Sequence, residues 1–190
     1  MRGKRERRVK IMSYAALPFV AIVGNSGSGK TTFMEKLISE MTGRGFKVGT
    51  IKHHHGRGLD MDKPGKDSWR HKKAGASVAV ISSPFQVGMA ADVDHDNEPE
   101  ELSHLFTGMD IVFCEGFKRG HIFKMEVFRP EISREILCGN DNMLLAFISD
   151  SDISDVDMNR PRAPVFPLND ASETSDFLME RFKLKYTEFS

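Results

Sequence analysis

The feature that most constrains the fold of this 190-residue chain is the segment Gly24–Thr31, GNSGSGKT, which fits the pattern G-x-x-x-x-G-K-[ST]. A short apolar run, residues 19–23, precedes it and is typical of a buried strand. In residues 31–44, which follow, apolar side chains recur at the spacing of one helical face. A strand, a glycine-rich loop and a helix in this order form a phosphate-binding loop, or P-loop. The segment therefore predicts that the chain binds a nucleoside triphosphate.

Each residue type in the P-loop has a chemical reason. The glycines allow the backbone to curl so that successive N–H groups face phosphate oxygens, and the first turn of the following helix adds further N–H groups. Lys30 is expected to reach the β and γ phosphates, and the hydroxyl of Thr31 is expected to complete the coordination of Mg²⁺. The predicted nucleotide-binding residues are Gly24, Asn25, Ser26, Gly27, Ser28, Gly29, Lys30, Thr31 and Thr32.

A carboxylate partner for the metal is expected at the end of a neighbouring strand. The expected buried strand 110–115 ends in Glu115, and open parallel sheets bind ligands at the carboxyl ends of their strands. Glu115 is therefore predicted to hold Mg²⁺ through water or to orient an attacking water, so Lys30 and Glu115 are the candidate catalytic residues. A solvated residue at a strand end is the alternative interpretation. The glycine and the two basic residues that follow Glu115 favour the functional one.

The rest of the chain alternates strands with helices. This alternation predicts an α/β fold of the P-loop NTPase kind, with a mostly parallel sheet flanked by helices on both faces. A capping box of Asp170 and Glu173 predicts a last helix that ends near residue 185. No linker divides the chain, so we expect a single P-loop domain, residues 14–190, after a basic leader, residues 1–13. Further strands are expected at 46–51, 77–82, 86–94, 110–115, 124–128 (with period-two alternation), 144–148 and 165–168, and further helices at 66–74 and 99–106.

Charge and cysteine content argue against several function classes. The 27 basic and 27 acidic residues give a formal net charge of zero, whereas proteins that coat nucleic acid usually carry a strong basic excess. Two cysteines without C-x-x-C spacing indicate neither a disulfide scaffold nor a cysteine zinc site, and they favour a reducing, cytoplasmic location. The sequence has no run of 18 or more apolar residues, so no membrane segment is expected.

Further motifs follow the P-loop in a characteristic order. VGTIKHHH at residues 48–55 is followed by DMDKPGKDS at residues 60–68 and by EGFK at residues 115–118. This series resembles the molybdopterin-guanine dinucleotide biosynthesis protein B (MobB) family over about residues 18–170. The resemblance implies a protein that binds GTP and Mg²⁺, hydrolyses GTP weakly and forms homodimers. It also implies a partner, the guanylyltransferase MobA, which joins GMP to molybdopterin in molybdenum cofactor biosynthesis, and it leaves molybdopterin open as a further ligand.

The positions shared with the family suggest further contacts. Asp62, with Asp60 beside it, would hold the metal, although a D-x-D pair is also an ordinary solvated loop. Basic side chains would contact a phosphorylated ligand, although exposed lysine and arginine are often simply solvated surface. The residues of this basic set are Lys52, Lys66, Arg70 and Lys118.

Two segments allow more than one interpretation. The three histidines His53–His55 could bind a metal, but adjacent side chains in extended backbone point in opposite directions, so a turn at a strand end is favoured. The N-K-x-D loop that reads guanine in many GTPases is absent from the sequence. Asn169–Asp170 or Ser149–Asp150, each after a late strand, could supply a carboxylate to guanine, so the preference for GTP rests on the resemblance alone.

Two other functions stay open on the sequence alone. A P-loop small-molecule kinase would begin with the same loop but would need a mobile lid bearing arginines, for which the sequence offers no clear segment. A metal-delivery chaperone GTPase would use the histidine stretch. The sequence alone does not decide between an enzyme and an accessory protein.

Overall fold

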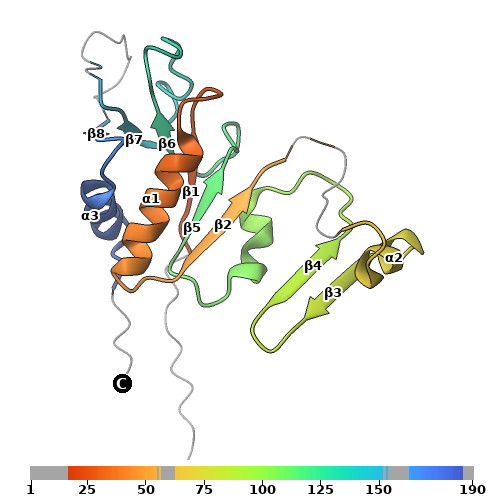
Figure 1. Ribbon diagram of the computed structural model, residues 1–190. Coiled ribbons are helices and arrows are strands. Elements are labelled where there is room, and N and C mark those ends of the chain that lie inside the picture. Colours follow the sequence, from red (N-terminus) through yellow and green to blue (C-terminus); the bar gives the residue numbers. More distant parts are fainter. Residues whose placement is uncertain (1–16, 55, 57–62, 152, 154–162, 186–190) are drawn as a thin grey trace, which may run out of the picture.

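The main feature of the computed structural model, which describes residues 17–54, 56, 63–151, 153 and 163–185, is a six-stranded parallel sheet (Figure 1). Its strands are β1 (Phe19–Val23), β2 (Val48–Lys52), β5 (Ile111–Glu115), β6 (Phe123–Val127), β7 (Leu144–Ile148) and β8 (Val165–Phe166). They lie in the order β2-β5-β1-β6-β7-β8, and each pair of neighbours is parallel. The predicted α/β fold is confirmed, and the carboxyl ends of the strands meet at one edge.

Two helices, α1 (Lys30–Gly43) and α3 (Ser172–Phe182), cover one face of this sheet (Figure 1). The apolar face of α1 that the sequence predicts is the buried one, because Phe33, Leu37 and Met41 are fully buried. Burial of such side chains contributes about 1.5–3 kcal/mol each relative to exposure. This packing fixes the direction of α1 and thereby the loop that precedes it.

The opposite face of the sheet is covered mainly by irregular structure. The 3-10 helix η1 (Pro99–Phe106) places Phe106 against this face. Ile122 and Cys138, from the segments before and after β6, complete this second core cluster. Helical structure therefore lies against both faces, but loops do much of the covering on this one.

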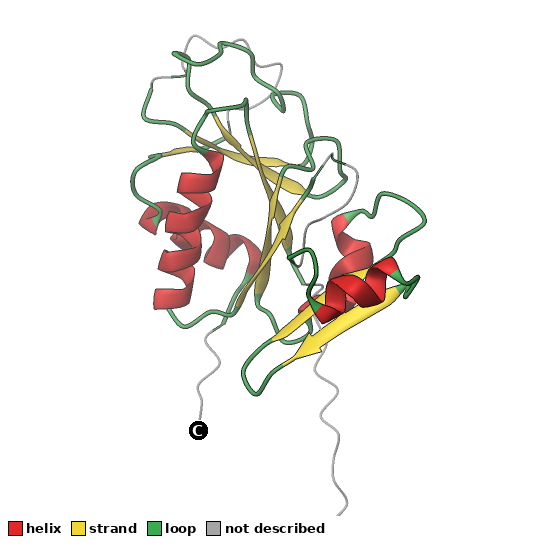
Figure 2. Cartoon of the chain, turned by 45° about the vertical axis from the view of Figure 1, so that its right-hand side comes forward, coloured by secondary structure: helices red, strands yellow, loops and turns green. Residues whose placement is uncertain are grey.

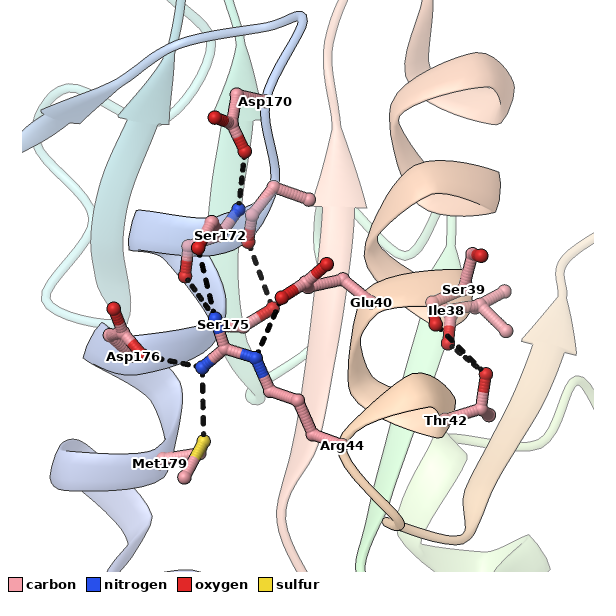
Figure 3. Close-up of polar contacts among 11 residues, drawn as sticks. Ile38, Ser39, Glu40, Thr42, Arg44, Asp170, Ser172, Ser175, Asp176 and Met179 are labelled. Carbon is pink, nitrogen blue, oxygen red and sulfur yellow. Dashed lines mark hydrogen bonds and ion pairs between the residues drawn. The ribbon is translucent and has the colours of Figure 1, made fainter.

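Arg44, just after α1, joins this helix to α3 (Figure 3). Its guanidinium donates to the carboxylates of Asp176 and Glu40, and to the hydroxyl of Ser172 at 3.0 Å. The hydrogen bonds that Arg44 donates to Asp176 and, next in effect, to Glu40 raise the pKa of Arg44 above its ordinary value. The contacts hold the two helices together at the end opposite the P-loop.

The capping box predicted for α3 is wrong. The N-cap residue is Ala171, and no side chain caps the helix there. Asp170 lies one residue earlier and accepts the N–H of Ser172 at 2.8 Å, as aspartate does in a turn. The helix ends at Phe182, and Lys183 follows in the left-handed conformation.

The period-two alternation in residues 124–128 does not mark an exposed face, because Lys124 and Glu126 are both buried. Lys124 forms an ion pair with Asp141 at 2.8 Å. Glu126 accepts the N–H groups of Leu137 and Cys138 at 2.7 and 2.8 Å. Buried charges need such partners, and here the partners lie in the segment that folds over β6.

A second, antiparallel sheet of two strands, β3 (Val78–Ser82) and β4 (Val87–Ala91), projects to one side of the parallel sheet (Figure 2). The helix α2 (Asp67–Lys73) packs on this hairpin. Within the described ranges, no helix is long and apolar enough to cross a membrane. The predicted leader, residues 1–13, lies outside the described residues.

Candidate functional site

The P-loop leaves β1 and curls into α1. Gly24, Gly27 and Gly29 have φ angles of 149°, 77° and 93°, which glycine adopts without the strain that a side chain would add. Gly24 also lies close to β6: a Cβ atom on it would stand 2.5 Å from the carbonyl oxygen of Val127. The loop conformation therefore depends on glycine at the positions that the pattern specifies.

The first turn of α1 is open to an anion. Its N-cap residue, Gly29, provides no side-chain hydrogen bond to the helix. Unpaired N–H groups and the positive end of the helix dipole attract negative charge at such a terminus. The buried hydroxyl of Ser28 also has no hydrogen-bond partner among the described residues. The chemistry of this loop therefore fits a phosphate group.

The ammonium group of Lys30 folds back onto the loop and donates to the carbonyl oxygen of Asn25 at 2.8 Å. Burial lowers its pKa, the charge of Glu115 acts in the opposite direction, and the charge of Lys52 lowers it further. An anionic ligand would stabilise the charged form of Lys30 in this environment, because a nearby negative charge favours the ammonium over the neutral amine.

The carboxylate of Glu115 lies at the centre of a small polar cluster. Its Oε1 atom accepts a hydrogen bond from the hydroxyl of Thr31 at 3.0 Å and lies 3.2 Å from the ammonium nitrogen of Lys52. Glu115 is 16% exposed and Lys52 is 67% exposed, so the lysine can leave while the carboxylate stays in place. The hydroxyl and carboxylate oxygens are the donor types that Mg²⁺ prefers.

Strand pairing explains this convergence. Glu115 is paired with Ile22 of β1 and with Lys52 of β2, so it lies between the two strands at their carboxyl ends. The P-loop leaves the same edge of the sheet directly after Val23. The structure thus brings together Lys30, Thr31 and Glu115, which were predicted from separate parts of the sequence.

The segment after Glu115 bends sharply toward β2. Gly116 has a φ of 98°, and Phe117 adopts the left-handed conformation at φ 55°, which is uncommon for an aromatic residue. The ring of Phe117 lies 4.9 Å from that of His53, and the Nε2 atom of His53 lies 2.9 Å from a carboxylate oxygen of Asp96. Sequence reasoning did not assign Asp96 to the site, because only the fold brings the segment before η1 next to β2.

A cavity of about 620 Å³ opens beside the P-loop. Its lining comes from the end of β1 and the P-loop (Val23, Gly24 and Lys30), from His53, and from the segments before η1 and after β5. Lys118 and Arg119 of the latter segment are exposed. Of the predicted basic set, Lys52 and Lys118 therefore lie at the site.

The other members of the predicted set lie elsewhere. Lys66 is the N-cap residue of α2, and Arg70 lies within this helix. The helix lies beside the hairpin and away from the strand ends that carry the P-loop (Figure 1). Asp62 and His55 lie outside the described residues. Among the residues that are described, no group of three or more histidine, cysteine, aspartate or glutamate side chains could hold a metal ion.

The candidates for guanine recognition have structural partners. Asp150 accepts the N–H of Leu168 at 2.8 Å and the side-chain amide of Asn169 at 2.8 Å. Asn169 in turn accepts a hydrogen bond from Lys36 at 2.9 Å. Asn169 and Thr32 line a shallow surface depression along α1. Asp150 and Asn169 thus lie together after β7 and β8, where they hold two loops in contact.

Comparison with known proteins assigns the chain to a family. Residues 19–150 match the family described as molybdopterin guanine dinucleotide synthesis protein B, or MobB. A molybdopterin-guanine dinucleotide biosynthesis adapter protein of Escherichia coli is 33% identical over 172 residues, which cover 86% of this chain and 93% of that protein. Its counterpart in Haemophilus influenzae is 38% identical over 122 residues, or 63% of this chain and 68% of that one. The crystal structure of Bacillus subtilis MobB superposes with a TM-score of 0.65 at 25% identity and covers 90% of this chain and 100% of its own.

Proposed function

Because this chain belongs to the MobB family and is thus an adapter in molybdopterin-guanine dinucleotide synthesis, we propose that it works by binding GTP and Mg²⁺ at the P-loop. With the nucleotide bound, it would assist a MobA-like guanylyltransferase that attaches GMP to molybdopterin. The observation that carries this proposal is the convergence of Lys30, Thr31 and Glu115 beside an uncapped helix terminus.

The residues of the P-loop divide the work of binding the triphosphate. The backbone of Gly24–Gly29 and the first turn of α1 supply N–H donors, and the Ser28 hydroxyl gains the partner that it lacks. Lys30 exchanges the Asn25 carbonyl for phosphate oxygens. The exchange is favourable because the ammonium then faces an opposite charge, which favours its charged form, instead of a neutral carbonyl.

Thr31 and Glu115 would hold Mg²⁺, either directly or through its water ligands, with Asp62 as a further candidate outside the described residues. When bound, the ion neutralises charge on the phosphate oxygens. Without the ion, Lys52 and Thr31 share the Oε1 atom of Glu115. An ion bound to this oxygen would release Lys52, which would then move toward the nucleotide.

Slow hydrolysis would depend on Lys30 and Glu115. Lys30 would stabilise negative charge that develops on the transferred phosphoryl group, and Glu115 would orient the attacking water. The hydrogen bond from Thr31 fixes the position of the Glu115 carboxylate for this role. The preference for guanine is part of the proposal and rests on the family.

A homodimer formed through the hairpin is also part of the proposal. In the β3–β4 register, Val78, Val80 and Met89 share one face and are 53%, 57% and 40% exposed; Val87, two residues from Met89, is 70% exposed. An isolated pair of strands with an exposed apolar face is only marginally stable in water. A second copy of the chain offers a matching apolar face and open strand edges, so we assign a second copy as the partner.

The location of the protein is also part of the proposal. Both cysteines are buried free thiols, which suits a reducing location such as the cytoplasm.

The test is the formation of molybdopterin-guanine dinucleotide by the partner guanylyltransferase with Mg²⁺, GTP and molybdopterin, with and without this chain. We expect the chain to raise the rate and the Lys30→Ala variant to lose most of the increase. Lys185, an exposed lysine near the end of the described chain, provides the control: Lys185→Ala should stimulate like the unmodified protein. An equal rate with the protein and with its Lys30→Ala variant would contradict nucleotide-dependent assistance. Transfer of phosphate from GTP to molybdopterin would support the kinase alternative instead.

A further inference from the structure

The cavity beside the P-loop is larger than the nucleotide phosphates require. Its volume of about 620 Å³ lies within the range of small-ligand sites. Of the P-loop residues, Gly24 and Lys30 line it. Most of its lining comes from His53, from residues 96–98 and from residues 116–120. A triphosphate bound by the P-loop would therefore leave most of this space open.

Cationic groups contribute to the lining of this space. Lys118 and Arg119 follow β5 and are exposed, and Lys30 comes from the P-loop. Arg119 forms no ion pair with any residue that the structure describes. A guanidinium presents donors that match two oxygens of a phosphate at once. Lined by these groups, the cavity is suited to a phosphate group other than those held by the P-loop.

Hydrogen-bond acceptors and aromatic rings also line the cavity. Asp96 and Glu98 are lining residues, as are His53 and Phe117, whose rings lie 4.9 Å apart and are tilted by 51° to each other. Asp96 holds His53 through its Nε2 atom at 2.9 Å. Carboxylates accept N–H donors, and aromatic rings stack on flat heterocycles.

The backbone after β5 is kept in an unusual shape. Phe117 has a φ of 55°, and backbone conformations of this kind are concentrated at functional sites. Gly120 is buried, and a Cβ atom there would lie 2.9 Å from a carboxylate oxygen of Glu98. The turn thus brings Lys118 and Arg119 next to the acidic segment instead of leaving them in open solvent.

We propose that this cavity is a second ligand site, which binds a small phosphate monoester of a flat nitrogen heterocycle beside the nucleotide. Arg119 and Lys118 contact the phosphate, and Asp96 and Glu98 accept N–H groups of the ring. The ring lies against Phe117. The inference rests on the proposed function, since it gives the pterin partner of the guanine nucleotide a place on this chain.

The experiment is calorimetric titration of the full chain, saturated with Mg²⁺ and the non-hydrolysable analogue guanosine 5′-(β,γ-imido)triphosphate. The probes are 6-hydroxymethylpterin phosphate, unphosphorylated 6-hydroxymethylpterin and inorganic phosphate. We expect the phosphorylated pterin to bind about tenfold more tightly than either fragment, since a charged hydrogen-bond pair contributes about 1.5 kcal/mol or more. In Arg119→Ala its Kd should rise about fivefold to tenfold.

The control variant is Arg134→Ala, which removes an exposed arginine that does not line the cavity. It should bind all three probes as the unmodified protein does. Thermal unfolding of both variants shows whether the fold is intact. Failure of the nucleotide-saturated protein to bind the phosphorylated pterin would overturn the second site. The second site would also be overturned if Arg119→Ala lost as much affinity for the nucleotide analogue as for the phosphorylated pterin, because the cavity would then belong to the nucleotide. Absence of analogue binding to the unmodified protein would instead contradict the proposed function.

Discussion

At the scale of single residues, one carboxylate oxygen connects three segments of the chain. The Oε1 atom of Glu115 accepts from Thr31 at 3.0 Å and lies 3.2 Å from the Lys52 ammonium, so the strand end, the start of α1 and the end of β2 meet at a single atom. The pairing with Lys52 balances the charge of Glu115. A more strongly charged cation would displace the lysine, because Lys52 is mostly exposed and loses little when it returns to water.

The two cysteines give a residue-scale prediction that depends on pH. Burial raises the pKa of Cys114 to about 12 and that of Cys138 to about 11. Because only the thiolate reacts readily, we expect very slow reaction with Ellman's reagent at pH 8 in the native protein and fast reaction of both thiols in guanidinium chloride. The raised pKa values also stabilise the fold below about pH 9, and this contribution is lost as the pH rises through about 11 for Cys138 and about 12 for Cys114. Rapid reaction of either thiol in the native protein would show that the second core cluster is open to solvent.

Some site residues could be predicted from the sequence and others could not. Lys30, Thr31 and Glu115 follow from a local pattern and from the rule that ligands bind at the carboxyl ends of parallel strands. Asp96 lies 43 residues from its partner His53, and no local pattern predicts such a contact. The resemblance to the family predicts Lys66 and Arg70 as phosphate contacts. In a single chain they lie at α2, beside the hairpin and apart from the P-loop.

At the scale of elements, the P-loop depends on its contact with β6. Gly24→Ala should destabilise the fold by about 2–4 kcal/mol, since it adds a strained φ to a clash with the Val127 carbonyl. Gly27 is the matched control. A Cβ atom there meets nothing within 4 Å, so Gly27→Ala should cost only the strain of its φ of 77°, about 1–2 kcal/mol. Urea unfolding followed by circular dichroism measures both free energies, and equal losses would contradict the close contact between the loop and β6.

The elements themselves were predictable to different degrees. The helical face of α1 has strong periodicity, β1, β5 and β7 are continuous apolar runs, and the structure places all four as expected. β6 was predicted as a strand, but not its burial, because its lysine and glutamate find partners in a loop that only the tertiary fold brings over them. The start of α3 differs from the predicted one for a local reason, because an aspartate such as Asp170 can form a turn as readily as it can cap a helix.

At the scale of the whole molecule, the projecting hairpin exposes several large apolar side chains, Val78, Val80, Ile81, Val87 and Met89 among them. We expect the protein to sediment as a dimer at micromolar concentration and Val80→Lys to weaken association about tenfold or more, since burial of a valine contributes about 1.5 kcal/mol or more. Val165 is 41% exposed at the edge strand of the other sheet, so Val165→Lys provides the control and should remain a dimer. Sedimentation equilibrium distinguishes these results, and an unmodified protein that stays monomeric would contradict the dimer.

The central claim is that this chain binds Mg²⁺-GTP through its P-loop. The most direct measurement is fluorescence titration with N-methylanthraniloyl-GTP in the presence of Mg²⁺, followed by displacement with unlabelled GTP or ATP. We predict saturable binding, efficient displacement by GTP, poor displacement by ATP and loss of binding in Lys30→Ala, because Lys30 provides the ammonium group of the loop. Full nucleotide affinity in Lys30→Ala would contradict the account, and equal displacement by GTP and ATP would contradict its guanine specificity.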